Sequence, residues 1–365
     1  FPDLIQFYGM ELNSPGADHS SLIMPQTSDE ALRLRKLESE FDRAEAWPID
    51  PARNEPARML DALREMETFA SKPVIIANHP SRSATGKGKW GLDEPSELRD
   101  WNDAAPDIAV GMAGAPGHQA AELSTHKPRR RGAYERSPTM GGFDQMTATL
   151  GGFWDSMLGE GRAWWITANS DSHRHYDEGG IDFWPGEYSK TWVFAKRTHA
   201  SILEALRAGH IFVSTGDLID RMDFVAATSG KHATIGETLV VRPGTVVHIL
   251  LRVRDPAAQN AGGEDPVVTR IDLIRGDLTG VAIDRSSARN PTTRIEARYT
   301  AQDWQVDGDN LTVETSIEID HSMYLRVRGT NTDQLEPEDD VPGENPWHDL
   351  WFYSNPIFVK VAQDS

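Results

Sequence analysis

The sequence predicts an α/β fold followed by a smaller β-rich domain, and two features of its hydrophobic pattern support this prediction. Up to residue 224, short apolar runs alternate with segments of helical spacing, and polar residues follow the runs. Such strand–helix–strand repetition is typical of an α/β layout, of which a closed barrel is one form. From residue 225 to residue 365, strand-like segments separated by Gly, Pro, Asn and Asp replace the helical pattern. That texture is typical of a β-sandwich.

The elements of the first region follow from residue spacing. Apolar runs bounded by turn residues predict buried strands, and apolar residues three and four apart predict helices. Gly209 follows the last helical pattern and is suited to a helix C-cap. The stretch 84–140 is rich in Gly, Pro and charge, so we expect a long loop that forms a lid or a binding surface. The expected strands are 4–12, 73–78, 163–168 and 192–195, and the expected helices are 27–46, 56–71, 144–160 and 199–208.

Composition excludes several classes of function. The chain has 37 basic and 56 acidic residues, a net charge of −19, which disfavours binding to nucleic acid or to an anionic membrane surface. It has no cysteine, so any metal must be held by His, Asp or Glu. No apolar run approaches the ~20 residues of a membrane span. We therefore expect a soluble protein without a membrane span, and the sequence leaves open its oligomeric state and whether it is cytoplasmic, periplasmic or secreted.

The chain starts within an apolar, strand-like stretch at Phe1 and has no initiator Met. Signal-peptide cleavage rarely leaves such a run as the new terminus. We interpret the chain as part of a longer protein.

The strongest local signal for chemistry is the segment 169–175. Asp171 and His173 stand two residues apart after a predicted strand, so in an extended backbone both side chains point to the same face. One oxygen and one nitrogen ligand at a strand end suit a metal site. A polar turn in which Asp171 caps the next segment is an equally good account of this segment by itself.

Two further strands end in residues that can bind metal. His79 follows the apolar run 73–78, and the carboxyl end of a buried strand is where ligands bind in α/β folds. Glu11 leaves another apolar run, where a carboxylate is costly unless it is paired or bound to a cation, and His19 follows shortly after. Each residue alone fits a cap or a loop contact. Three such strand ends in one chain favour a shared metal site.

The order of these motifs resembles that of the PHP (polymerase and histidinol phosphatase) superfamily of metal-dependent hydrolases. The segments 185–193 and 202–215 look like the closing part of such domains, and the chain is most similar to the carbaryl-hydrolase-like branch. The resemblance covers roughly residues 1–225. The matching motifs are Gly9-Met10-Glu11, the turn with His19, His79-Pro80, and Ser170-Asp171-Ser172-His173.

The resemblance implies a distorted (β/α)7 barrel whose strand ends hold two or three divalent metal ions, with Zn, Mn and Fe as candidates. Glu11 matches a carboxylate that commonly bridges two metals, and the other four residues match single ligands. PHP domains begin with a His-x-His strand and a second His-bearing motif, and neither occurs in these residues. We expect both to lie upstream of Phe1. The implied ligands are Glu11, His19, His79, Asp171 and His173.

The mechanism expected of such a site uses a metal-activated water as the nucleophile. Arg82 could bind a phosphate oxygen or an oxyanion, or it could form a surface ion pair. His118 could protonate a leaving group, or it could make a structural hydrogen bond. Trp164, Trp165 and Trp184 could form aromatic walls of a substrate pocket, with core packing as the alternative.

Three hypotheses of function remain at this point. The first is a phosphoesterase, the commonest activity across PHP domains. The second is a hydrolase of carbamates or carboxylic esters. The third is a non-catalytic protein with a degenerate metal site and a partner-binding β-domain. An Arg cluster in the pocket favours phosphate, and an apolar pocket favours an aryl ester or carbamate; in both enzymatic cases the partner is a small-molecule ester.

Overall fold

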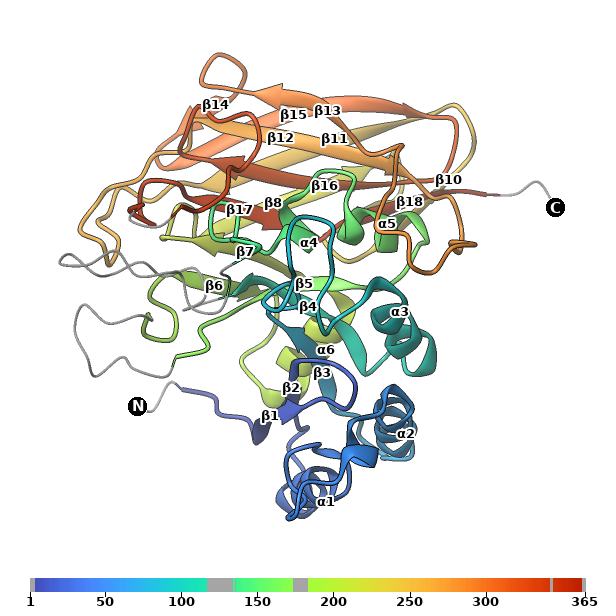
Figure 1. The fold of residues 1–365 in the computed structure, drawn as a ribbon. Helices are drawn as coiled ribbons and strands as arrows, with labels where there is room; N and C mark the ends of the chain where they lie inside the picture. The colour runs from blue at the N-terminus through green and yellow to red at the C-terminus, as the bar shows by residue number, and fades with distance from the viewer. Residues whose placement is uncertain (1–3, 117–133, 135, 173–182, 342–343, 363–365) are drawn as a thin grey trace.

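The structure is a computed structural model in which residues 4–116, 134, 136–172, 183–341 and 344–362 are described. The first half of the chain forms one curved sheet with helices around it, and the second half forms two further sheets that lie against it (Figure 1). Two hydrophobic clusters hold the molecule together. One lies between the first sheet and its helices, and the other lies between the two sheets of the second half.

The first sheet has the strand order β1-β2-β3-β4-β5. β1 pairs with β2 and β2 with β3 in antiparallel fashion, and β3, β4 and β5 are parallel neighbours. The strands are β1 (Gly9–Asn13), β2 (His19–Ile23), β3 (Val74–Asn78), β4 (Ala109–Pro116) and β5 (Trp165–Asn169). The helices are α1 (Glu30–Phe41), α2 (Pro56–Glu67), α3 (Pro95–Ala104), α4 (Gln145–Ala148), α5 (Phe153–Gly159) and α6 (His199–Ala208), with a 3₁₀ turn at Pro51–Asn54.

The second sheet contains strands from both sides of the predicted domain boundary at residue 224. β6 pairs with β7, and β7 pairs with β17 near the end of the chain. The third sheet is built from β8, β9, β11, β14 and β15. The remaining strands are β6 (Ser189–Val193), β7 (Ile211–Thr215), β8 (Arg221–Ala227), β9 (His232–Thr234), β10 (Thr238–Val241), β11 (Thr245–Arg254), β12 (Arg270–Asp277), β13 (Arg294–Tyr299), β14 (Gln305–Asp307), β15 (Asn310–Ile319), β16 (Met323–Thr330), β17 (Trp351–Ser354) and β18 (Ile357–Val361).

The predicted (β/α)7 barrel is wrong. Strands hold 34% of the structure against 18% in helices, and the described residues form three open sheets. A closed barrel of parallel strands needs a helical crossover between neighbours, whereas β2 runs antiparallel to both of its neighbours, β1 and β3. Between β5 and β6, a hydrogen bond to a side chain takes the place of backbone pairing: the backbone N–H of Ala168 donates to Thr191 Oγ1 at 2.7 Å.

The expected long loop over 84–140 contains two regular elements in its described part, α3 and β4. Pro95 occupies the first turn of α3, a favoured position for proline because its missing N–H is not needed there. Every residue of β4 is buried. Its glycines are required by packing, since a Cβ on Gly111 would lie 2.0 Å from the carbonyl oxygen of Trp165. The Gly-rich composition therefore marks a tightly packed strand here and not a loop.

A buried ion pair joins α5 to β16. Arg326 donates from Nε and Nη2 to the two oxygens of Asp155, both at 2.8 Å, and both side chains are almost fully buried. The Tyr324 hydroxyl donates to the same carboxylate at 3.0 Å. This cluster links the helices around the first sheet to the second sheet. Among the described helices, none has the length and apolarity needed to cross a membrane.

Candidate metal centre

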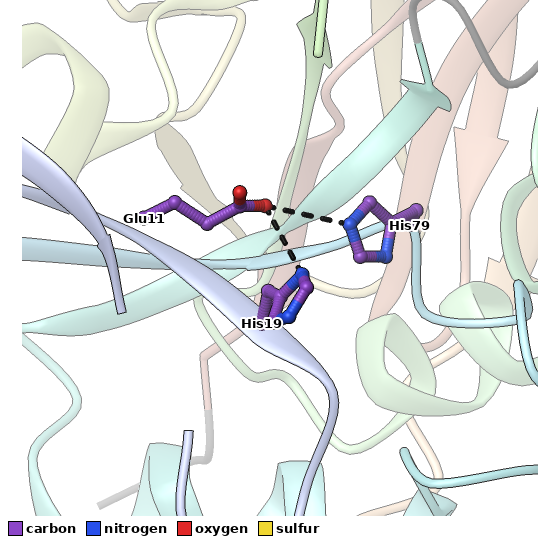
Figure 2. Close-up of side chains that lie close together, drawn as sticks. All are labelled: Glu11, His19 and His79. Atoms are coloured by element: carbon purple, nitrogen blue, oxygen red, sulfur yellow. Dashed lines mark ion pairs between the residues drawn. The ribbon is translucent and has the colours of Figure 1, made fainter. Parts of the chain in front are cut away.

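Glu11, His19 and His79 come from three neighbouring strands and converge at one edge of the first sheet (Figure 2). The strand register explains this convergence. Glu11 lies opposite Ser21 on β2, and His19 lies opposite Asn78 on β3. Residues directly opposite in a ladder share a face, and so do residues two apart on a strand. Alternation along the paired strands therefore places Glu11 and His19 on the same face of the sheet. His79 directly follows β3 and stands next to Asn78, so the turn out of the strand, and not alternation, brings its ring to this face.

The three side chains are within metal-binding reach of one another. Glu11 Oε1 lies 3.3 Å from His19 Nδ1 and 3.5 Å from His79 Nε2, as Figure 2 shows. One ligand atom from each residue falls within 4.8 Å of the others. Carboxylate oxygen and imidazole nitrogen are donors that Zn, Mn and Fe all accept, and they do not select among these metals. The residues present therefore fit a divalent ion.

His79 is the most unusual member of the group. Its side chain is only 2% exposed, and neither ring nitrogen has a hydrogen-bond partner within the described part of the chain. Buried polar atoms are nearly always hydrogen-bonded, and leaving them unpaired is costly. Its backbone is also in the left-handed region, with a φ of 34°, where non-glycine residues are uncommon and cluster at functional sites. A metal ion would satisfy the nitrogen that faces Glu11.

Asp171 shares the second of these features and faces the same place. Its φ is 44°, and its Oδ2 lies 4.0 Å from His79 Nε2. Its side chain is 11% exposed. The structure thus brings Glu11, His19 and His79 together, with Asp171 beside His79. The remaining expected ligand, His173, lies outside the described residues. The expected His-x-His motifs lie outside the sequence and stay a prediction.

The charge on Glu11 is stabilised by its neighbours. The imidazole of His19, followed by that of His79, holds the pKa of the Glu11 carboxyl well below its usual range. Burial acts in the opposite direction and is outweighed. Glu11 is therefore an anion near neutral pH, and a carboxylate beside two imidazole nitrogens is an arrangement that a cation would stabilise further.

Arg82 forms an ion pair with the buried carboxylate of Asp18. Its guanidinium donates from Nε and Nη2 to the two oxygens of Asp18, with the Nε contact at 3.0 Å. Asp18 is 2% exposed, and its Oδ2 lies 3.8 Å from His79 Nδ1. The backbone N–H of Asp18 also donates to Asp93. Burial raises the pKa of Asp93, and the charge of Asp18 adds to the effect. Arg82 thus holds a carboxylate behind His79, and the expectation that it binds an anion stays a prediction.

A cavity of about 610 Å³ opens beside the metal ligands, between the first sheet and β6. Its polar lining includes Glu11, His79 and Asp171. None of the described residues that line the cavity is Lys or Arg. The apolar lining residues are Ile23, Ile76, Ala113, Pro116, Ala168, Pro185, Val193 and Leu206.

The tryptophans expected to form aromatic walls are not among the described residues that line this cavity. Trp164 and Trp165 are 0% and 3% exposed and belong to the hydrophobic core. Trp184 is 56% exposed, and its backbone N–H donates to Glu187. Core packing, the alternative for these residues, accounts for the first two. The expected leaving-group acid His118 lies outside the described residues, so its role stays a prediction.

Two groups of residues that sequence reasoning missed support the site. Asn78 donates from Nδ2 to Glu11 Oε1 at 3.2 Å, and Asn169 donates to Asn78. Each stands next to a recognised motif, directly before His79 and two residues before Asp171. Polar residues in the last position of an otherwise apolar strand were the signal that could have found them. Asp18 carried a similar signal, as the residue before His19.

A second group of carboxylates, Asp340, Glu344 and Asp349, also meets a simple distance criterion for metal binding. Its chemistry differs, because Asp340 accepts hydrogen bonds from the backbone N–H groups of Gly141 and Gly142 at 2.8 and 3.0 Å. Asp349 accepts from the indole of the nearby Trp351. These bonds tie the carboxylates to the protein, and we assign the group a structural role.

The chain matches no protein-family model, and no match was found among the curated proteins.

Proposed function

We propose that this chain is a metal-dependent hydrolase whose metal site is formed by Glu11, His19, His79 and Asp171. The observation that carries the proposal is His79, a buried and strained histidine whose ring nitrogens lack hydrogen-bond partners in the described part of the chain. A site that opens onto a cavity of about 610 Å³ has room for a substrate beside the ligands. A purely structural metal site would instead be closed by protein ligands.

The chemistry follows from the ligand set and its surroundings. A divalent ion held by these residues would lower the pKa of a water molecule toward 7 and would polarise the group that is attacked. The carboxylates of Glu11 and Asp171 would contribute charge that balances the ion. Asp18, held by Arg82, stands 3.8 Å from His79 Nδ1 and can fix the orientation of that ring. This proposal includes the resemblance to PHP-type hydrolases, which rests on the motifs that contain the candidate ligands.

The lining of the cavity bears on the substrate class. A phosphoester, the first expectation, carries negative charge and is usually held by Arg or Lys. The described lining offers neither, and Arg82 is paired with Asp18. A cavity lined both by apolar residues and by the candidate metal ligands favours a neutral ester or carbamate with an apolar body. We therefore place carboxylic ester or carbamate hydrolysis before phosphoester hydrolysis.

The experiment is a hydrolysis assay of the 365-residue chain on matched 4-nitrophenyl substrates: an acetate, an N-methylcarbamate and a phosphate. We expect metal-dependent release of nitrophenol from the neutral substrates, loss of activity with a chelator, and recovery when divalent metal is added. Glu11→Gln should remain inactive after metal addition. Activity on every substrate that survives the chelator and the Glu11→Gln substitution would contradict the proposal. Faster hydrolysis of the phosphate would restore the phosphoesterase hypothesis.

A further inference from the structure

A chain of hydrogen-bonded polar side chains lines the cavity and ends on Glu11. Asn169 on β5 donates from Nδ2 to Asn78 Oδ1 at 2.7 Å, and Asn78 donates from Nδ2 to Glu11 Oε1 at 3.2 Å. The hydroxyl of Ser21 on β2 donates to the same Asn78 oxygen at 2.9 Å. The Thr167 hydroxyl in turn donates to Asn169 Oδ1 at 3.1 Å. Four strands thus contribute to one polar chain.

The orientation of the Asn78 amide is determined by this chain. A primary amide has one acceptor end and one donor end, and a half-turn exchanges them. In the observed orientation, Asn78 Oδ1 receives two donors and Nδ2 faces a carboxylate. The reverse orientation would place Oδ1 against Glu11 Oε1 and the amide hydrogens against those of Asn169. Both contacts would be repulsive, so Asn169 and Ser21 hold Asn78 with its donor toward Glu11.

We propose that Asn78 is a positioning residue for the metal site, and that Asn169 sets the orientation in which it acts. This inference rests on the proposed function, because it concerns Glu11 as a metal ligand. Hydrogen bonds from outside the ligand set orient the ligands and tune their affinity for metal, and their loss typically weakens metal binding about 10–100-fold. Asn78 is 6% exposed, so its protein neighbours, more than solvent, set the orientation of its amide.

A structural role is the alternative, since the same hydrogen bonds join β1, β2, β3 and β5. The two roles differ in what they predict for an added negative charge. Asn169→Asp places a carboxylate against Asn78 Oδ1 and reverses the Asn78 amide, so that its oxygen faces Glu11. The positioning role predicts weaker metal binding. A simple electrostatic effect predicts the opposite, because another carboxylate near the site attracts cations.

The experiment measures zinc and manganese affinity of the chelator-treated protein by isothermal titration calorimetry, together with the thermal unfolding midpoint of the metal-free forms. We expect Asn78→Ala and Asn169→Asp each to weaken metal binding at least about 10-fold. Ser170→Asp is the matched control, because Ser170 lines the same cavity; its added charge should leave the affinity unchanged or raise it. Ser21→Ala removes one of the two donors to Asn78 and should give a smaller loss, which also covers the case in which Asn78→Ala does not fold.

The outcomes separate this inference from the proposed function. If the wild type binds metal and Asn169→Asp binds it as tightly or more tightly, the positioning role is overturned and the metal site stands. If the variants lose thermal stability but keep wild-type affinity, the amide chain is structural and the inference is also overturned. A wild type that binds neither zinc nor manganese would overturn the proposed function, and this inference with it.

Discussion

Two buried polar clusters of this molecule differ in how their charges and hydrogen bonds are matched. Around Asp155, the carboxylate meets a bidentate guanidinium from Arg326 and a hydroxyl from Tyr324. Around His79, a buried imidazole has carboxylates 3.5–4.0 Å away and no hydrogen bond from the described residues. The first cluster also has ordinary backbone geometry, whereas His79 and Asp171 have positive φ.

The difference teaches how to separate structural from functional polar groups. A protein that buries charge for structural reasons gains most when the charges are paired, as at Asp155, where Nη1 is the one guanidinium nitrogen of Arg326 without a hydrogen-bond partner among the described residues. Strain and unmatched donors persist only where the surrounding fold enforces them, and they concentrate where a ligand completes the site. The comparison predicts that the Asp155 cluster controls stability and that the His79 cluster controls metal binding, with little overlap.

The largest effect is expected from Arg326→Met, which leaves Asp155 buried without its partner. Removing one member of a buried pair typically costs 3–5 kcal/mol, so we expect the free energy of unfolding to fall by about that amount in urea denaturation. Metal affinity should stay at the wild-type value. Arg254→Met is the control, because its pair with Asp220 is at the surface and should cost less than about 1 kcal/mol. Equal losses for the two variants would remove the distinction drawn above.

His79→Ala should show the reverse pattern. We expect metal affinity to fall more than about 100-fold, beyond the range typical for residues outside the ligand set. The unfolding free energy of the metal-free protein should fall by much less than for Arg326→Met, because no hydrogen bond from the described residues is lost. His321→Ala is the control, since His321 is exposed and pairs with Asp277 at 2.8 Å. If His79→Ala lost stability but kept its metal, His79 would belong to the structural class.

Glu97 sharpens the comparison, because it is an unmatched carboxylate away from the metal site. Burial, followed by the charges of Glu94 and Asp100, raises its pKa from 4.5 to about 8. The folded state thus keeps a proton that the unfolded state releases above pH 4.5, so stability is highest below that pH and falls as the pH rises toward 8.

We therefore expect Glu97→Gln to raise the free energy of unfolding by roughly 1–2 kcal/mol at pH 8.5, after allowance for solvent screening. The gain should vanish at pH 4, and metal affinity should not change. Thermal unfolding at both pH values checks this, with Glu318→Gln, an exposed carboxylate on β15, as control. A change in metal affinity would show that an unmatched group influences the site even at a distance from it.

The sequence predicted the convergence of the candidate ligands better than it predicted the fold. Glu11 and His79 were found from a local signal, a polar residue after an apolar run, and His19 from its place shortly after Glu11. Glu11 and His19 share a face by alternation along paired strands, whereas His79 reaches that face through the turn that follows β3. Strand order is not readable in this way, since neither the antiparallel β1–β2–β3 arrangement nor the pairing of β7 with β17 leaves a local signature.

Two further features could not be predicted from the sequence, for physical reasons. β4 was missed because its Gly and Ala residues read as loop, although they are small where neighbouring strands approach closely, as at Gly111. For Arg82 the sequence left anion binding and an ion pair open, and it could not show that the fold brings Asp18 to this side chain across 64 residues. Contacts between residues distant in the sequence decide both whether a charged side chain is paired and which strands lie side by side.

The most direct test of the metal site is a zinc titration of the chelator-treated chain beside two matched variants, Glu11→Gln and Glu344→Gln. Each removes one carboxylate charge from one of the two groups that meet the distance criterion for a metal. We predict saturable binding by the wild type, unchanged binding by Glu344→Gln, and a loss of more than about 100-fold for Glu11→Gln. Binding that is lost in Glu344→Gln and retained in Glu11→Gln would place the metal in the other group and contradict the site proposed for this protein.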